Sequence, residues 1–201
     1  MLQPQLWIVA GPNGSGKSTL YGRDTDFEIV GKSVWIINPD LLTARLVDVE
    51  KLEQQTANIA ALNRIMDWLQ ASIATHQTIG VETVLSSDKY RALVETAKAR
   101  GYEVRLIYVM VQDAATNIAR VATRVRTGGH NVPTDRIVQR RARSLAQLPW
   151  FLHAADLALL LDNTQAEPRL MGEKTGGVIT LYDGAFPELR AAAEQAKAMA
   201  G

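Results

Sequence analysis

The sequence contains no cysteine, and its 201 residues include only three histidines, His76, His130 and His153. Without cysteine the chain can form neither a disulfide bond nor a Cys-ligated zinc site, and it has no thiol nucleophile. The three histidines are far apart, with no spacing that indicates a metal site. These absences exclude several enzyme classes and favour a cytoplasmic location.

Long hydrophobic runs are absent as well. No apolar run approaches the roughly 18 to 20 residues that a membrane-spanning helix needs, and the first four residues lead directly into a strand-like segment, so we expect neither a signal peptide nor a membrane partner. The composition is ordinary for a globular protein, with 47% hydrophobic and 21% charged residues. We therefore predict a single domain over residues 1–201.

The net charge of +1 conceals an uneven distribution. The segment from Arg120 to Arg143 contains seven arginines and one acid, Asp135, so it carries +6 while the rest of the chain carries −5. Such a basic block indicates that an anionic ligand binds at one place, and both nucleotide phosphates and nucleic acid would fit. No Phe, Tyr or Trp lies between these arginines to stack on bases, so a nucleic-acid partner is not expected.

The most informative stretch is Gly11-Pro12-Asn13-Gly14-Ser15-Gly16-Lys17-Ser18-Thr19, which matches G-x-x-x-x-G-K-[ST]. It follows an apolar run at 6–10 that predicts a buried strand, and a helix can begin directly after it. Backbone N–H groups of such a loop surround a polyphosphate. Lys17 would reach the β- and γ-phosphates, and the Ser18 hydroxyl would bind Mg²⁺. A glycine turn that only joins a strand to a helix is the alternative, but the context favours a nucleoside triphosphate site.

Further apolar runs predict strands at 34–37, 78–83, 104–111 and 157–161, alternating with helices. Three of them have an acid at or just beyond their carboxyl end, namely Asp40, Glu82 and Asp162. In a parallel sheet the carboxyl ends of the strands form the ligand-binding edge. We predict an α/β fold of the P-loop NTPase or kinase type, a three-layer α-β-α arrangement with a mostly parallel central sheet and a helical lid.

The predicted helices carry additional expectations. A long amphipathic helix is predicted over 50–75, with one apolar face packed in the core. That face consists of Leu52, Ile59, Leu62, Met66, Leu69 and Ile73. Ser86 or Ser87 is expected to cap the next helix, and Asp113 the one after strand 104–111. A hairpin and a terminal helix are predicted over about 168–200.

Phosphoryl transfer needs a base near the attacking hydroxyl and positive charge at the γ-phosphate. We predict Asp40 as the base, at the end of a strand expected to neighbour the P-loop strand; an Asp that only caps the following helix is the alternative. Glu82 and Thr83 are predicted to hold the hydroxyls of the acceptor, although Glu82 would also suit a capping role or a pair with a lid arginine.

The predicted lid covers about 120–148 and turns at Gly128-Gly129. Closing it would bring guanidinium groups onto the γ-phosphate. Arg124 and Arg140, one from each side of the turn, are the predicted catalytic arginines. Arg141 falls on the apolar stripe of its helix and is expected to extend over apolar neighbours.

Seven segments together resemble the zeta toxin family of P-loop kinases: GPNGSGKST, NPD, ETVLSS, GYEVRLIYV, IARVATRVRTGGHNVP, RRARSL and LDN. They run from residue 6 to about 163, and the Gly-Gly-His-x-Val-Pro loop is the most specific of them. The chain is most similar to the short stand-alone zeta-like proteins often labelled predicted ABC-type ATPases.

The resemblance implies ATP- or GTP-dependent phosphorylation of a hydroxyl on a small molecule. Characterised zeta toxins phosphorylate the amino sugar of UDP-N-acetylglucosamine and are held inactive by an antitoxin. The resemblance also implies that Asp40 is the base, that Glu82 contacts substrate, and that Asn163 lies where such kinases hold adenine. His130, in the Gly-Gly-His-x-Val-Pro loop, is also predicted to bind substrate.

Two features depart from the family. Arg141 stands where short relatives tend to have an aromatic residue, and the chain lacks the C-terminal extensions of classical toxins, which leaves the substrate open. A polynucleotide-end kinase and a nucleotide-binding module without kinase activity are therefore the alternatives. Lys17, Ser18 and Asp40 are all present, so the sequence carries no sign of lost chemistry.

Overall fold

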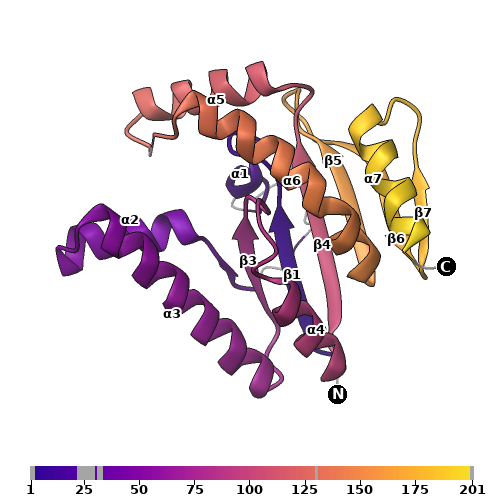
Figure 1. Ribbon diagram of the computed structural model, residues 1–201, viewed down its shortest axis with the longest axis horizontal. Coiled ribbons are helices and arrows are strands. Elements are labelled where there is room, and N and C mark those ends of the chain that lie inside the picture. The colour runs from indigo at the N-terminus through magenta and orange to yellow at the C-terminus, as the bar shows by residue number, and fades with distance from the viewer. Residues whose placement is uncertain (1–2, 22–29, 31–33, 130, 200–201) are drawn as a thin grey trace.

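The structure is a computed structural model, and it describes residues 3–21, 30, 34–129 and 131–199 (Figure 1). Its elements in chain order are β1 (Gln5–Ala10), α1 (Lys17–Tyr21), β2 (Ile36–Ile37), α2 (Pro39–Glu50), α3 (Gln54–Ala74), β3 (Ile79–Thr83), α4 (Arg91–Ala99), β4 (Glu103–Met110), α5 (Ala114–Arg126), α6 (Thr134–Ala154), β5 (Leu157–Asp162), β6 (Arg169–Thr175), β7 (Val178–Leu181) and α7 (Pro187–Ala198).

The strands form one seven-stranded sheet in the order β2-β3-β1-β4-β5-β6-β7. The first five strands are parallel, and β6 and β7 add an antiparallel hairpin at one edge. The P-loop strand β1 lies in the interior of the sheet, where Leu6 pairs with Ile79 of β3 and with Val104 of β4. This arrangement confirms the predicted α/β fold with a mostly parallel central sheet.

The two faces of the sheet are covered unequally. Leu6 and Ile8 belong to a large apolar core to which α3, α4, α6 and α7 all contribute buried side chains. Their neighbours Trp7 and Val9 point to the opposite face, as alternation along a strand requires, and there Leu20 of α1 packs against a smaller cluster. Most of the helical mass among the described residues therefore lies on one side (Figure 1).

Strand β2 is shorter than predicted and stands elsewhere in the sheet. It contains only Ile36 and Ile37, so residues 34 and 35 lie outside it. Its end agrees with the prediction, because Asn38 caps helix α2 and Pro39 occupies the first turn of that helix, where a missing N–H costs nothing. The expectation that this strand neighbours the P-loop strand is wrong, since β2 pairs with β3 and β3 separates it from β1.

The helix predicted over 50–75 corresponds to α3, which begins only at Gln54 because α2 ends at Glu50 and Lys51 between the two helices is left-handed with φ 56°. The predicted core stripe is confirmed at Leu69 and Ile73, which are buried, and is wrong at Ile59, which is 57% exposed, and at Leu62, which is 36% exposed. The buried face of α3 instead carries alanines in its first half, and their small side chains let α2 pack closely against it through Leu46.

The later elements agree better with the sequence. Asp113 caps α5 by accepting a hydrogen bond from the Thr116 backbone N–H at 2.7 Å, and the terminal hairpin and helix form as predicted. Ser86 and Ser87 do not cap a helix, because α4 begins only at Arg91. No helix within the described ranges is both long and apolar enough to cross a membrane.

Candidate nucleotide and phosphoryl-transfer site

The loop between β1 and α1 has the shape that the motif predicts. Its glycines at 11 and 16 have φ of +144° and +88°, a conformation that L side chains rarely adopt. A Cβ atom at Gly16 would collide with the side-chain amide of Asn163, and one at Gly11 would collide with the Val109 carbonyl oxygen. The loop therefore requires glycine at both positions for conformation and for space.

Lys17 lies buried at the start of α1, 6% exposed. Its Nζ donates to the carbonyl oxygens of Gly11 at 2.8 Å and Pro12 at 3.1 Å, and lies 3.9 Å from Glu82 Oε1. Burial lowers the pKa of Lys17, while the nearby carboxylates of Glu82 and Asp40 act in the opposite direction. The ammonium group is thus held inside the loop, close to two acids.

Glu82 connects the end of β3 to the P-loop helix. Its Oε2 accepts hydrogen bonds from the Ser18 hydroxyl at 2.8 Å and from the Asn38 side-chain amide at 2.9 Å. A serine hydroxyl and a carboxylate at hydrogen-bonding distance are oxygen ligands of the kind that Mg²⁺ prefers. Within the described ranges no cluster of three or more acids or histidines is placed to hold a metal ion. Mg²⁺ would therefore depend on Ser18, Glu82 and the phosphates of the nucleotide.

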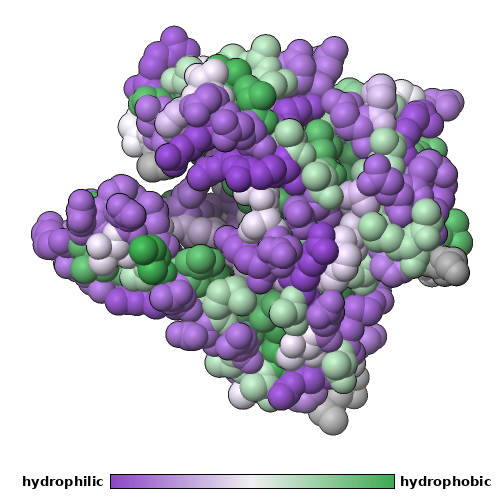
Figure 2. Space-filling model, viewed as in Figure 1, coloured by the Kyte–Doolittle hydropathy of each residue, from purple (hydrophilic) through white to green (hydrophobic). Residues whose placement is uncertain are grey.

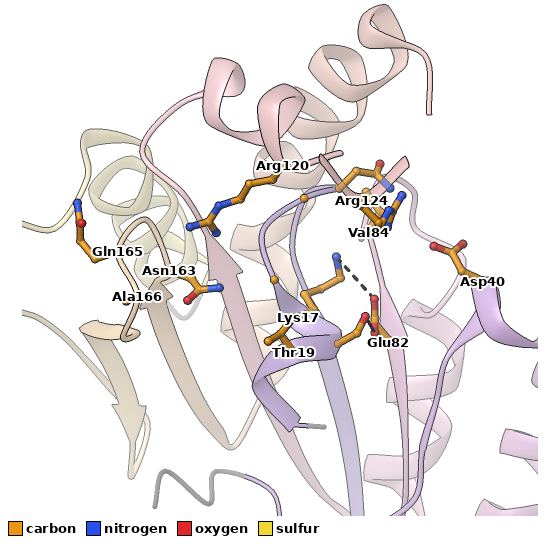
Figure 3. A pocket seen from close by; sticks show the side chains of 14 residues that line it. Lys17, Thr19, Asp40, Glu82, Val84, Arg120, Arg124, Asn163, Gln165 and Ala166 are labelled. Atoms are coloured by element: carbon orange, nitrogen blue, oxygen red, sulfur yellow. Dashed lines mark hydrogen bonds and ion pairs between the residues drawn. The ribbon is translucent and has the colours of Figure 1, made fainter. Parts of the chain in front are cut away.

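Asp40 lies in the first turn of α2, and its side chain is exposed on the wall of the same cavity as Lys17 and Glu82 (Figure 3). The alternative in which Asp40 caps the helix does not hold, because Asn38 is the cap: its Oδ1 accepts from the backbone N–H groups of Asp40 and Leu41. The Asp40 carboxylate is left facing the cavity.

Arginines reach the site from the two helices of the predicted lid. Arg124 lines the cavity, together with Arg120 one turn earlier on α5. Arg140 of α6 does not line it but donates to Asn13 Oδ1 at 3.5 Å. Partial burial and the neighbouring Arg136 lower the pKa of Arg140, and the Asp40 carboxylate partly offsets this. Arg124 and Arg140, the two predicted arginines, therefore lie near the P-loop. Arg120, which was not predicted, also lines the cavity.

The expectation that Arg141 extends over apolar neighbours is wrong. Its guanidinium group is buried and donates to the carbonyl oxygens of Val111 at 2.9 Å and Gln112 at 3.2 Å and to Asn117 Oδ1 at 3.1 Å. Glu188 Oε1 of α7 lies 3.5 Å away. Arg141 faces inward because these backbone acceptors lie at the end of β4, which the helical pattern of α6 does not reveal.

Asn163 follows β5 and braces the opposite side of the loop. Its side-chain amide donates to the Ser15 carbonyl oxygen at 2.8 Å, and the residue lines the cavity beside Gln165 and Ala166. Arg120 donates to the Thr164 carbonyl oxygen at 2.9 Å from across the opening. These contacts form the end of the cavity that lies furthest from Asp40 (Figure 3).

The cavity has a volume of about 440 Å³. It opens into the hollow that separates the α2–α3 pair from α5 and α6, and the surface there is mostly hydrophilic (Figure 2). The predicted residues that line it are Asn13, Gly14, Gly16, Lys17, Ser18, Thr19, Asp40, Glu82, Arg124 and Asn163. Those that do not are Gly11, Pro12, Ser15, Thr83 and Arg140. His130 lies outside the described residues.

Thr83 has a supporting place instead. Its hydroxyl accepts from the Leu85 backbone N–H at 3.0 Å, and its carbonyl oxygen accepts from the Gly11 N–H at 3.2 Å. Two residues that the sequence reasoning did not assign are Arg120 and Asn38. The spacing of four between Arg120 and Arg124 placed both on one helix face, whereas nothing in the sequence indicated the contacts of Asn38.

A central parallel sheet, a glycine-rich phosphate loop with its lysine and serine, and acids at the ends of the neighbouring strands define a P-loop nucleotide-binding protein of the kinase-like kind. Residues 6–149 match the AAA_33 family, described as an AAA domain, and the chain belongs to this family. A relative in Haemophilus influenzae, described as an uncharacterized protein, is 27% identical over 147 residues, which are 70% of this chain and 99% of the relative.

Solved structures share the fold. AvrRxo1-ORF1 in its complex with ORF2 and ATP aligns with a TM-score of 0.69 at 15% identity over 96% of this chain, which spans 64% of that longer chain. A chain from the PezAT toxin–antitoxin system of Streptococcus pneumoniae aligns with a TM-score of 0.63 at 15% identity, covering 100% of this chain and 88% of that one. At such identities the likeness shows a common fold.

Proposed function

We propose that the protein is an ATP-dependent kinase of the zeta toxin type, which transfers the γ-phosphate to a hydroxyl of a sugar nucleotide such as UDP-N-acetylglucosamine. The observation that carries this proposal is that the phosphate-binding residues and the proposed base line one cavity. The P-loop residues Lys17 and Ser18 form one part of its wall, and the exposed carboxylate of Asp40 forms another.

ATP is proposed to bind with its phosphates in the P-loop and its base toward Asn163. Backbone N–H groups of the loop and the start of α1 favour the negative charge of the phosphates. Lys17 would exchange its hydrogen bonds with Gly11 and Pro12 for phosphate oxygens, and Ser18 with Glu82 would hold Mg²⁺, which neutralises charge on the phosphates when bound. The AvrRxo1-ORF1 complex crystallised with ATP supports this choice of nucleotide.

The acceptor hydroxyl is proposed to approach from the side of Asp40. Asp40 takes the hydroxyl proton as the oxygen attacks the γ-phosphorus, the bond from that phosphorus to the β–γ bridging oxygen breaks, and ADP leaves with the bonding electrons. Arg124 and Arg140 are placed to stabilise charge on the γ-phosphate oxygens. Glu82, which lines the cavity, and His130, as the sequence suggests, are proposed to help hold the acceptor, whereas Thr83, which does not line the cavity, is proposed only to support the loop.

The choice of acceptor and of partner rests on the resemblance to zeta toxins. The PezAT neighbour is part of a toxin–antitoxin system, which supports the proposal that an antitoxin binds this protein and blocks its activity. Expression in bacteria with and without the gene product of an adjacent reading frame, scored by growth, tests that partnership. We expect the wild-type protein alone to inhibit growth, and we expect normal growth when the partner is co-expressed or when a kinase-inactive variant replaces the wild type.

The decisive experiment is transfer of label from γ-³²P-ATP in the presence of Mg²⁺ to a panel of sugar nucleotides, with Asp40→Asn as the matched variant. Asn is nearly isosteric with Asp but cannot take a proton, so label on UDP-N-acetylglucosamine should be lost while ATP binding stays nearly unchanged. A transfer rate that is the same in the variant contradicts Asp40 as the base. ATP binding without label on any sugar nucleotide contradicts the acceptor, and 5′-hydroxyl polynucleotides are the next acceptors to test.

A further inference from the structure

Asn38 is the residue between the edge strand β2 and helix α2, and it uses both ends of its side-chain amide. The oxygen accepts from the backbone N–H groups of Asp40 at 2.9 Å and Leu41 at 3.3 Å. The nitrogen donates to Glu82 Oε2 at 2.9 Å and lies 3.3 Å from the Ser18 hydroxyl oxygen. The orientation of the amide is fixed chemically, because only its oxygen can accept from backbone N–H groups and only its nitrogen can donate to a carboxylate.

These contacts join two parts of the site whose strands, β2 and β1, do not pair with each other directly. Asp40 belongs to α2, which follows the two-residue edge strand β2, whereas Ser18 follows the interior strand β1. Strand β3 stands between them and contributes Glu82. Among the side-chain contacts described above, Asn38 is the one that connects the helix of the proposed base to the proposed Mg²⁺ and phosphate end.

We propose that Asn38 is a positioning residue: its amide sets the place of Asp40 relative to Ser18 and Glu82. The inference rests on the proposed function for its consequence in catalysis, and on the proposed Mg²⁺ site at Ser18 and Glu82 for its consequence in metal binding. Without the nitrogen donor, Glu82 loses one partner that orients its carboxylate, and α2 can shift relative to the P-loop. Outer partners of metal-binding groups typically change metal affinity or activity by about 10–100-fold when they are removed.

A purely structural role as helix cap makes a different prediction. Asn, Asp and Ser are nearly equal as N-cap residues, because each offers an oxygen to the first backbone N–H groups. Only Asn also offers a nitrogen donor. Asn38→Ser therefore keeps the cap and removes the link, and Asn38→Asp keeps the cap and places a carboxylate against Glu82.

The test compares wild type, Asn38→Ser, Asn38→Asp and the control Asn58→Ser, which makes the same change at an exposed position of α3. Four quantities are measured: the melting temperature, the Mg²⁺ concentration that half-saturates ATP binding, and kcat and KM for phosphate transfer. We expect both Asn38 variants to melt within about 4 °C of wild type, since a shift of that size corresponds to a small change in stability for a chain of this length.

The expected functional result is specific to the link. In Asn38→Ser, half-saturation should require about tenfold more Mg²⁺ and kcat should fall about 10–100-fold, with less change in KM for ATP. Asn38→Asp should lower kcat further because of charge repulsion with Glu82, and Asn58→Ser should match wild type.

Two outcomes overturn the inference. In the first, Asn38→Ser has the kcat and Mg²⁺ dependence of wild type. In the second, kcat falls in both Asn38 variants only in proportion to an equal fall in their melting temperatures. The proposed function fails separately. If wild type labels no acceptor but Asn38→Ser still shifts the Mg²⁺ requirement of ATP binding, the acceptor assignment is wrong and the positioning role of Asn38 is supported.

Discussion

Replacing Arg141 with methionine removes a buried guanidinium group while keeping much of the side-chain volume. Two of its acceptors, the Val111 carbonyl oxygen and Asn117 Oδ1, belong to residues that are fully buried, and no water can replace the lost donor there. Each buried acceptor left without a partner costs about 1–3 kcal/mol. The other two partners of Arg141, Gln112 and Glu188, are exposed enough for water to replace the lost donor, so they add no cost.

The expected loss of stability is therefore about 4 kcal/mol, the middle of the summed range. For a chain of this length each kcal/mol lowers the melting temperature by about 2–4 °C, so Arg141→Met should melt roughly 8–16 °C below wild type. The assay is thermal unfolding followed by circular dichroism or calorimetry. Arg143→Met is the matched control, because Arg143 lies on the same helix but is exposed.

A functional loss should accompany the thermal one. The Asn117 side chain that Arg141 orients donates to the Asn13 carbonyl oxygen of the P-loop at 2.7 Å. ATP affinity of Arg141→Met, measured below its melting range, should therefore fall too. Equal melting temperatures of Arg141→Met and Arg143→Met would refute the reasoning, because they would mean that the buried hydrogen bonds of Arg141 contribute nothing net.

Two further predictions concern the cavity itself. Lys17→Ala should weaken ATP binding and slow transfer together, measured by calorimetric titration and label transfer, whereas the exposed Lys51→Ala should change neither; unchanged ATP affinity in Lys17→Ala would contradict the role of the loop. Arg124→Ala should lower kcat by roughly 10³-fold with little change in ATP affinity, as expected of an arginine that acts on the γ-phosphate. The control is the exposed Arg126→Ala on the same helix, and an equal kcat in the two variants would remove Arg124 from the transition state.

Sequence reasoning worked where one short segment contains its own physical explanation. The P-loop could be found because strand, glycines, lysine and helix start follow one another directly, and Asp113 could be found because a cap and its helix are adjacent. Glu82 was found because it ends an apolar run, although its contacts with Ser18 and Asn38 depend on strand order. The order of strands in a parallel sheet is set by crossovers rather than by any local pattern, so the place of β2 was predicted wrongly.

The missed features depend on contacts between distant segments. Arg141 fits the apolar stripe of α6, and only the end of β4 explains why a charged group is buried there. Ile59 and Leu62 fit a helical stripe equally well, yet the alanines of α3 form the buried face because α2 folds back over them. In both cases the periodicity was real, but the neighbouring element decided which face became the core.

The interior place of β1 also has a consequence for how the chain acquires its structure. Gln5 pairs with Glu103, and Leu6 pairs with Ile79, so the strand made first has both of its partners far downstream. During synthesis the P-loop strand cannot be paired along both sides until Tyr108 has left the ribosome. Contacts over such long separations make folding slow and leave apolar strands exposed for longer. The nucleotide site, although encoded near the N-terminus, is therefore among the later parts of the molecule to form.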